Sequence, residues 1–255
     1  MDFSVKRLDH LGVIAGTMQE LNLIEMVDTL LQADKQNILT PGEVVQAMII
    51  NGLGFSSKPT TLTPQFFATK PTDELIRPGI SSEQLNRFKL GRVLDSIYEY
   101  GCEKFFNEIA LQICIAEKID ITHVYNDTTT FSFEGNYDNQ DEEVPVQITY
   151  GYSKAKRPDL KQMMLELCVS SDGGIPFIMR PWSGNKSDNQ IFKERVQALC
   201  KTIKSSGDGI TVIADSKLYS KENVTAMGNV HFITRVPASI NKEVDYVNLA
   251  VKNND

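Results

Sequence analysis

The residue pattern changes after Asp120, and this change constrains the fold more than any other feature of the chain. Before it, apolar residues recur at steps of three and four, as in Leu21–Leu31, which is typical of amphipathic helices. After it, β-branched and aromatic runs such as Val124–Phe133 indicate strands. The sequence therefore predicts an all-helical N-terminal domain over residues 1–119 and an α/β domain over residues 120–255.

Local signals place the helices of the first domain. Thr40–Glu43 forms a helix start, with Thr as the N-cap and Pro at the first helical position, and this helix is expected to stop at Asn51-Gly52. Residues 58–79 are rich in Thr and Pro and are predicted to form a loop. A later helical stretch is predicted to break near Gly101.

Strands dominate the prediction for the second half of the chain. The predicted strands cover residues 124–133, 144–152, 162–170, 210–214 and 230–236, with residues 175–181 continuing the third or pairing with it. Helices are predicted from Ser187-Asp188 to about Ile203 and from Ser220. Meander strands followed by alternating helices and strands favour a mixed sheet with helices on its faces.

Composition excludes several classes of protein. No apolar run approaches the roughly 18 residues of a membrane-spanning helix, and the N-terminus has no apolar signal core. The 4 cysteines form no CxxC pair, and with only 3 histidines in the chain a zinc site is not expected. These features favour a cytoplasmic protein with reduced cysteines and no contact with membranes.

Charge bears on binding to nucleic acid. The formal net charge is −7, which argues against binding over the whole surface. The second half nevertheless holds a basic run in which only Asp159 is acidic: Lys154, Lys156, Arg157 and Lys161. These side chains are candidate contacts for DNA phosphates, and the alternative is a solvated strand end.

Two carboxylates stand out by position. Asp127 lies inside a predicted strand among uncharged neighbours, where a buried carboxylate needs a partner or a metal ion. Asp215 follows the apolar strand 210–214, and ligands gather outside the carboxyl ends of such strands. On neighbouring strands the pair could hold divalent cations for phosphoryl transfer. The alternative is that Asp127 pairs with a buried Arg or Lys and that Asp215 caps a turn.

Four motifs, taken in order, resemble those of DDE transposases of prokaryotic insertion sequences, with the broad IS-four group as the closest branch. They are Val124-Tyr-Asn-Asp-Thr-Thr-Thr-Phe, Ile148-Thr-Tyr-Gly-Tyr-Ser-Lys with Arg157-Pro-Asp-Leu-Lys-Gln, Gly184-Asn-Lys-Ser-Asp, and Ile213-Ala-Asp-Ser-Lys-Leu-Tyr-Ser. The stretch Lys6–Gly16 also resembles the helical leader of such proteins.

This resemblance implies a ribonuclease-H-like core with catalytic carboxylates that bind Mg²⁺ or Mn²⁺. Its first catalytic Asp, on the first strand, matches Asp127, and its second, just after the fourth strand, matches Asp215. In the family, water cleaves a phosphodiester at the transposon end, and the released 3′-hydroxyl attacks target DNA. The implied partner is double-stranded DNA, bound by a homodimer. The domain over residues 1–119 would bind DNA ends or mediate dimer contacts.

One departure from the family pattern leaves the activity open. The third carboxylate of the family, a Glu in a Tyr-Arg-x-x-Glu-x-x-x-Lys context, has no counterpart after Val236. Glu222 and a polar-tail Glu243 are weak substitutes. We therefore expect an incomplete core with exposed apolar surface, belonging to a truncated transposase. The alternative is an inactive remnant that binds DNA or an intact transposase and inhibits it.

Overall fold

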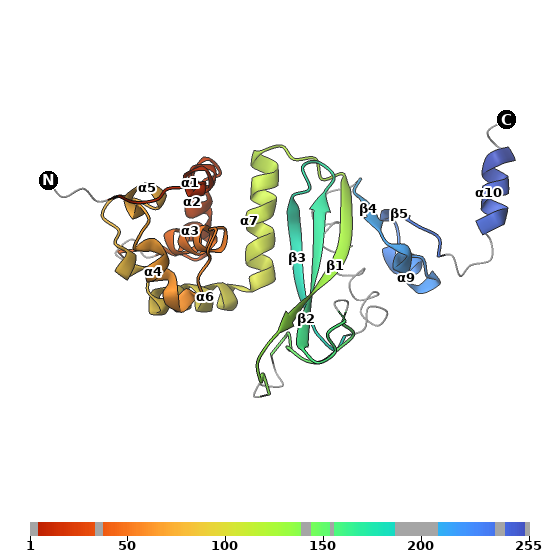
Figure 1. Cartoon of the computed structure of the whole chain (residues 1–255). Helices are drawn as coiled ribbons and strands as arrows, with labels where there is room; N and C mark the ends of the chain where they lie inside the picture. The colour runs from red at the N-terminus through yellow and green to blue at the C-terminus, as the bar shows by residue number, and fades with distance from the viewer. Residues whose placement is uncertain are drawn as a thin grey trace. The chain divides into compact units, whose positions relative to one another are not determined.

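A computed structural model of the chain describes residues 5–33, 38–138, 144–153, 156–186, 209–237 and 243–252. The chain divides into two compact units, Met1–Ala116 and Glu117–Asp255. In the parts described, the first unit is built from helices and the second contains the sheet (Figure 1).

The helices of the first unit follow the apolar periodicity of the sequence. They are α1 (Leu11–Glu20), α2 (Leu23–Leu30), α3 (Pro41–Gly52), α4 (Thr63–Phe67), α5 (Thr72–Leu75), α6 (Arg87–Tyr100) and α7 (Cys102–Ala116), with 3-10 turns η1 (Thr60–Leu62) and η2 (Ser82–Gln84). The predicted break near Gly101 is confirmed. Gly101 has a φ of 98°, which favours glycine, and it separates α6 from α7.

The prediction of a loop over residues 58–79 is wrong, because η1, α4 and α5 lie within it. The error has a physical cause, since Thr and Pro favour the first turn of a helix as well as loops. Pro64 occupies the first turn of α4, and Pro71 is the N-cap residue of α5.

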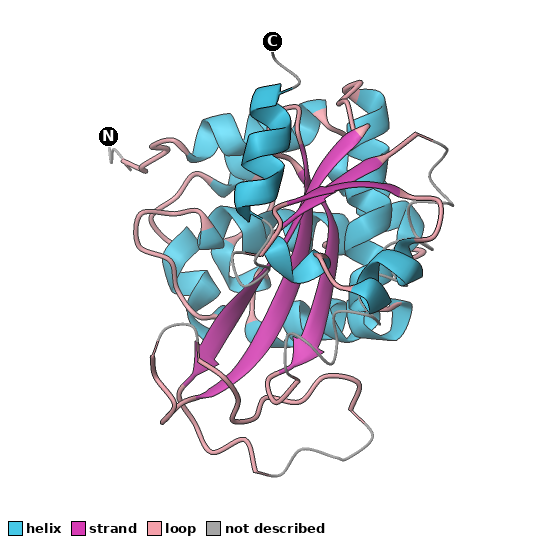
Figure 2. Ribbon diagram, turned by 90° about the vertical axis from the view of Figure 1, so that its right-hand side faces the viewer, coloured by secondary structure: helices cyan, strands magenta, loops and turns pink. Residues whose placement is uncertain are grey.

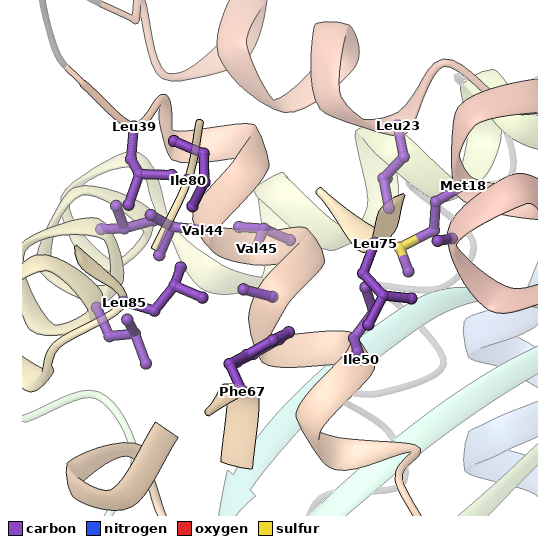
Figure 3. Packing of buried hydrophobic residues seen from close by; sticks show 14 of the residues in the cluster. Met18, Leu23, Leu39, Val44, Val45, Ile50, Phe67, Leu75, Ile80 and Leu85 are labelled. Atoms are coloured by element: carbon purple, nitrogen blue, oxygen red, sulfur yellow. The ribbon is translucent and has the colours of Figure 1, made fainter. Parts of the chain in front are cut away.

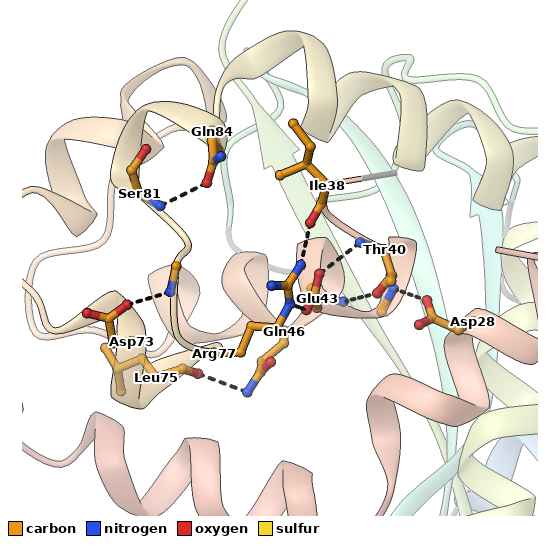
Figure 4. Close-up of polar contacts among 12 residues, drawn as sticks. Asp28, Ile38, Thr40, Glu43, Gln46, Asp73, Leu75, Arg77, Ser81 and Gln84 are labelled. Carbon is orange, nitrogen blue, oxygen red and sulfur yellow. Dashed lines mark hydrogen bonds and ion pairs between the residues drawn. The ribbon is translucent and has the colours of Figure 1, made fainter. Parts of the chain in front are cut away.

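The N-terminus of α3 forms as predicted and anchors the first unit (Figure 4). The Thr40 hydroxyl accepts a hydrogen bond from the Glu43 amide at 3.2 Å, and the Glu43 carboxylate accepts one from the Thr40 amide at 2.9 Å. Asp28 of α2 accepts a hydrogen bond from the Gly42 amide at 2.6 Å. The buried Glu43 also pairs with Arg77, which ties α3 to the segment that follows α5.

Apolar side chains from α1 to α7 form one core in this unit (Figure 3). Its fully buried members include Leu11, Val27, Leu39, Val44, Ile50, Phe67, Leu75, Leu85 and Leu90. Each such side chain contributes about 1.5–3 kcal/mol to stability by leaving water. Packing into this shared core explains why helices as short as α4 and α5 are stable here.

The second unit contains a five-stranded mixed sheet, which confirms the predicted fold class at that level (Figure 2). Its strands are β1 (His123–Phe133), β2 (Lys161–Ser170), β3 (Pro176–Ser183), β4 (Thr211–Ala214) and β5 (His231–Thr234). Their order is β3-β2-β1-β4-β5. The first three pair antiparallel, β4 pairs with β1 in parallel, and β5 pairs with β4 in parallel.

The prediction of a strand over residues 144–152 is wrong. Within the described residues this segment forms one isolated bridge, from Thr149 to Gln162. Pro145 has no N–H to give to a ladder. Gly151 packs so close to the end of β3 that a Cβ atom there would lie 1.8 Å from the carbonyl oxygen of Gly184.

The remaining elements are the turn η3 (Ser216–Leu218) and the helices α9 (Lys221–Met227) and α10 (Glu243–Lys252). Ser220 caps α9 as predicted, whereas Glu243 begins a helix and does not belong to a polar tail. The helix predicted from Ser187-Asp188 lies outside the described residues. None of the helices described has the length and hydropathy to cross a membrane.

Candidate functional site

Asp127 lies on the exposed face of β1. Val124, Asn126 and Thr128 are buried while Tyr125 and Asp127 are exposed, as the two-residue period of a strand requires. The Asp127 carboxylate accepts a hydrogen bond from the Thr128 amide at 2.7 Å. In the described part of the chain Asp127 forms no ion pair with Arg or Lys, so its position is not explained there by a buried pair.

Asp215 comes directly after β4 and is also exposed. Its main-chain carbonyl oxygen accepts hydrogen bonds from the Leu218 amide at 3.1 Å and from the Thr234 hydroxyl at 2.6 Å. The first of these bonds closes η3, and the second links the end of β4 to the end of β5. The main chain at Asp215 is therefore held from two sides.

The parallel register of β1 and β4 brings the two residues together. Tyr125 lies opposite Ile213, and Asn126 lies opposite Ala214. Asp127 and Asp215 are the next residues along each strand. Neighbouring strands are about 4.8 Å apart, and residues at one level of a sheet present side chains to the same face. Both carboxylates thus belong to one edge of one exposed face.

Two carboxylates at this spacing repel each other, and a divalent cation removes the repulsion. Their oxygen atoms suit Mg²⁺ or Mn²⁺, hard cations that keep several water ligands. Among the residues described, no group of three or more His, Cys, Asp or Glu side chains is placed to hold a metal ion. Two carboxylates alone would leave most of the coordination of such a cation to water or substrate.

The residues of the basic run that the structure describes have different surroundings. Lys154 lies outside the described residues. Arg157 forms a bidentate salt bridge with Asp159, in which Nε donates to Oδ1 at 2.8 Å and Nη2 donates to Oδ2 at 2.6 Å. Hydrogen bonding within this pair raises the pKa of Arg157 and lowers that of Asp159. The guanidinium charge is therefore already balanced by a carboxylate.

Lys161 is engaged inside the unit. Its Nζ donates to Asp138 and to the carbonyl oxygen of Asn136 and lies 5.6 Å from the centre of the Tyr150 ring. The side chain is only 11% exposed. Lys156 is exposed and forms no ion pair with a described residue, so among the described cations of the run it has the most freedom to meet a phosphate.

The structure also reveals a buried carboxylate that the sequence analysis missed. Glu166 of β2 is 2% exposed and accepts hydrogen bonds from Asn126 and Trp182. The signal was present in the sequence, because Glu166 is a lone charge between Leu165 and Leu167 in an apolar run.

Comparisons with known proteins give distant likenesses. A family model described as "Domain of unknown function (DUF4277)" matches residues 3–111. No curated protein matches the chain.

Among solved structures, the chain is similar to a piggyBac transposase synaptic complex with hairpin DNA, at 9% identity and a TM-score of 0.45. That match covers 93% of this chain and 53% of the transposase, so the chain spans about half of its length. A Mos1 transposase paired-end complex with the left transposon end matches at 11% identity and a TM-score of 0.31, over 81% of this chain and 62% of the other. A Mos1 mariner paired-end complex with Mn matches at 10% identity and a TM-score of 0.31. That match covers 96% of this chain and 84% of the other chain.

Proposed function

We propose that the chain is a DDE-type DNA transposase that cleaves phosphodiester bonds at transposon ends and joins those ends to target DNA. The observation that carries the proposal is the position of Asp127 and Asp215, each one residue beyond a register pair of the adjacent strands β1 and β4. The sequence resemblance implies one carboxylate on the first strand of a ribonuclease-H-like core and another just after the fourth. Asp127 lies on β1 and Asp215 directly follows β4, which supports the proposal.

The chemistry of the pair agrees with this assignment. Asp127 and Asp215 would hold Mg²⁺ or Mn²⁺ through carboxylate oxygens at the exposed edge of the sheet. The bound cation would supply activation of an attacking oxygen and stabilisation of a leaving one. The protein fixes both main-chain positions, through the β1–β4 ladder and through the hydrogen bonds to the Asp215 carbonyl. Asp127 and Asp215 are both exposed, as contact with a DNA backbone would require.

DNA is the proposed partner, bound by a homodimer in the cytoplasm. A chain with net charge −7 repels DNA at long range, so its affinity must come from local cations such as Lys156 and from the site cations. We expect binding to be weak without divalent metal and to decrease with salt in proportion to the number of phosphates contacted.

The test is nicking of a supercoiled plasmid that carries the DNA flanking this gene on both sides. The full chain is incubated with Mn²⁺, alongside Asp127→Asn, Asp215→Asn and the control Glu134→Gln, which neutralises an exposed carboxylate just past β1. We expect nicks from the parent chain and from the control but from neither Asp variant. Equal nicking by all four proteins would reject the proposed site.

A second candidate function is a DNA- or transposase-binding protein that does not cleave and inhibits an intact transposase. The lack of a third metal-ligating side chain among the described residues favours it. DNA binding without nicking in Mn²⁺ would select this candidate. Absence of both binding and nicking would reject both functions.

A further inference from the structure

A buried polar cluster lies on the face of the sheet opposite Asp127. Glu166 of β2 accepts a hydrogen bond from Asn126 Nδ2 at 2.9 Å and one from Trp182 Nε1 at 3.2 Å. Asn126 Nδ2 also lies 3.1 Å from Cys168 Sγ. Glu166 and Asn126 are only 2% and 9% exposed. The cluster therefore connects β1, β2 and β3 through side chains.

The position of Glu166 in the ladder shows which face it occupies. It lies opposite Thr128 of β1, whereas Asp127 lies opposite Leu167. Partners in a ladder share a face, so Glu166 lies with Asn126 and Thr128 beneath the sheet and Asp127 lies above it. Glu166 is for this reason not a third ligand of the candidate metal site.

A carboxylate buried to this degree requires hydrogen-bond donors or a cation. Arg180 of β3 is the register partner of Glu166, and its guanidinium carbon lies 6.0 Å from the centre of the Trp182 ring. Cross-strand partners of opposite charge stabilise a sheet. The carboxylate thus has donors from two neighbouring strands and a cation directly opposite on one of them.

Asn126 joins this cluster to the candidate site. It immediately precedes Asp127, and its ladder partner Ala214 immediately precedes Asp215. Because the Asn126 side chain is held from below, rotation or slippage of β1 at this level would break its bond to Glu166. A slip by one residue would also turn Asp127 to the buried face.

We propose that Glu166 is a positioning residue, which holds Asn126 and thereby fixes Asp127 level with Asp215. The role of this placement in metal binding rests on the proposed function. The placement itself does not, because the hydrogen bonds and the register exist without a metal ion.

The test exchanges donor and acceptor between the two side chains of the full chain. Glu166→Gln places an amide N–H₂ against the Asn126 N–H₂ or the Trp182 N–H, and Asn126→Asp places a second carboxylate against Glu166. The double variant restores a donor–acceptor pair, and its amide oxygen still accepts from Trp182. The Cys168 thiol can then donate to the new carboxylate. Phe177→Leu, which trims a buried side chain of β3 outside the cluster, controls for general destabilisation.

Two measurements are made on each protein: amide hydrogen exchange of residues 123–130 and binding of Mn²⁺ followed by its electron paramagnetic resonance. We expect each single variant to speed exchange in this segment and to weaken Mn²⁺ binding by about tenfold or more, in the range of changes to residues that orient metal ligands. The double variant should recover both properties, and Phe177→Leu should keep the parent Mn²⁺ affinity.

A double variant no better than the single ones, or Phe177→Leu with the same local loss, would overturn the positioning role. If the parent chain binds no Mn²⁺, the proposed function fails by itself. Exchange in residues 123–130, with its recovery in the double variant, then decides the positioning role alone.

Discussion

Asn126 of β1 lies directly opposite Ala214 of β4 in parallel register, and each is followed by an aspartate. Whether the two carboxylates meet therefore depends on the pairing of β4, a strand of 4 residues that lies between β1 and β5. Since a shift by one residue exchanges the faces of a strand, this short ladder determines the geometry of the candidate site.

Asp127→Asn is expected to leave the metal-free protein as stable as the parent, or to stabilise it by up to about 1 kcal/mol. The variant removes repulsion between like charges on adjacent strands and keeps an oxygen that can accept from the Thr128 amide. Urea unfolding in EDTA measures the difference. Addition of Mn²⁺ should then stabilise the parent and not the variant. A variant that loses more than about 1 kcal/mol in EDTA would contradict this account of the charges.

Gly184→Ala is expected to destabilise the protein by about 1–3 kcal/mol, because overpacking against main chain forces a backbone shift. A Cβ atom at this position would lie 1.9 Å from the carbonyl oxygen of Gln162. Gly91→Ala is the matched control, since Gly91 lies within α6 with no atom near its Cβ position. That control should gain about 0.5–1 kcal/mol from helix propensity. Thermal or urea unfolding distinguishes the expected loss of stability from the expected gain. A Gly184→Ala variant as stable as the parent would show that the main chains of Gly184 and Gln162 can move apart.

The sequence predicted the sheet better than its connections, and particular residues show why. The run in β1 has a β-branched and aromatic composition, β2 holds the apolar run Met163–Leu165, and the apolar run of β4 is short, so their type follows from local pattern. Residues 144–152 carry a similar pattern but form one bridge, because the close approach of Gly151 to Gly184 is a tertiary contact that no local pattern reports.

The candidate site was only partly predictable, for a related reason. Asp127 and Asp215 could be singled out because a charge in a strand and a charge after a strand are visible locally. The register that makes them neighbours is a property of strand pairing and had to come from the fold. The pairing of Lys161 with Asp138, which lies 23 positions away in the chain, could not be predicted either, because it depends on the fold.

Asp9→Asn should lower stability at neutral pH and have no effect in acid. Asp9 accepts a hydrogen bond from Lys70 at 2.7 Å, and this bond lowers the pKa of Asp9 below its ordinary value of 3.8. A carboxyl whose pKa is lowered by folding contributes stability above its unfolded pKa and loses it as the pH falls through the folded pKa. Asn also tolerates the left-handed φ of 51° at this position, so the variant isolates the charge.

Melting temperatures of both proteins from pH 7 to pH 2.5 check this prediction. The two curves should be separate at pH 7 and converge below about pH 3.8, where Asp9 of the parent takes up a proton. Curves that stay parallel over the whole range would mean that the Lys70 pair contributes nothing through charge.

Lys156→Gln and Lys161→Gln are expected to have different effects, the first on DNA binding and the second on stability. Lys156 is exposed without an ion-pair partner among the described residues, so its loss should weaken binding to a labelled DNA duplex and reduce the salt dependence of log K by about 0.9 for one phosphate contact. Lys161 is held by Asp138 and the Asn136 carbonyl, so its loss should lower the melting temperature and leave the salt slope unchanged. Both quantities come from fluorescence anisotropy titrations over a salt series and from thermal unfolding of the same samples. Equal losses of salt slope would show that Lys161 leaves its internal partners to bind DNA, and the basic run would then act on DNA as a unit.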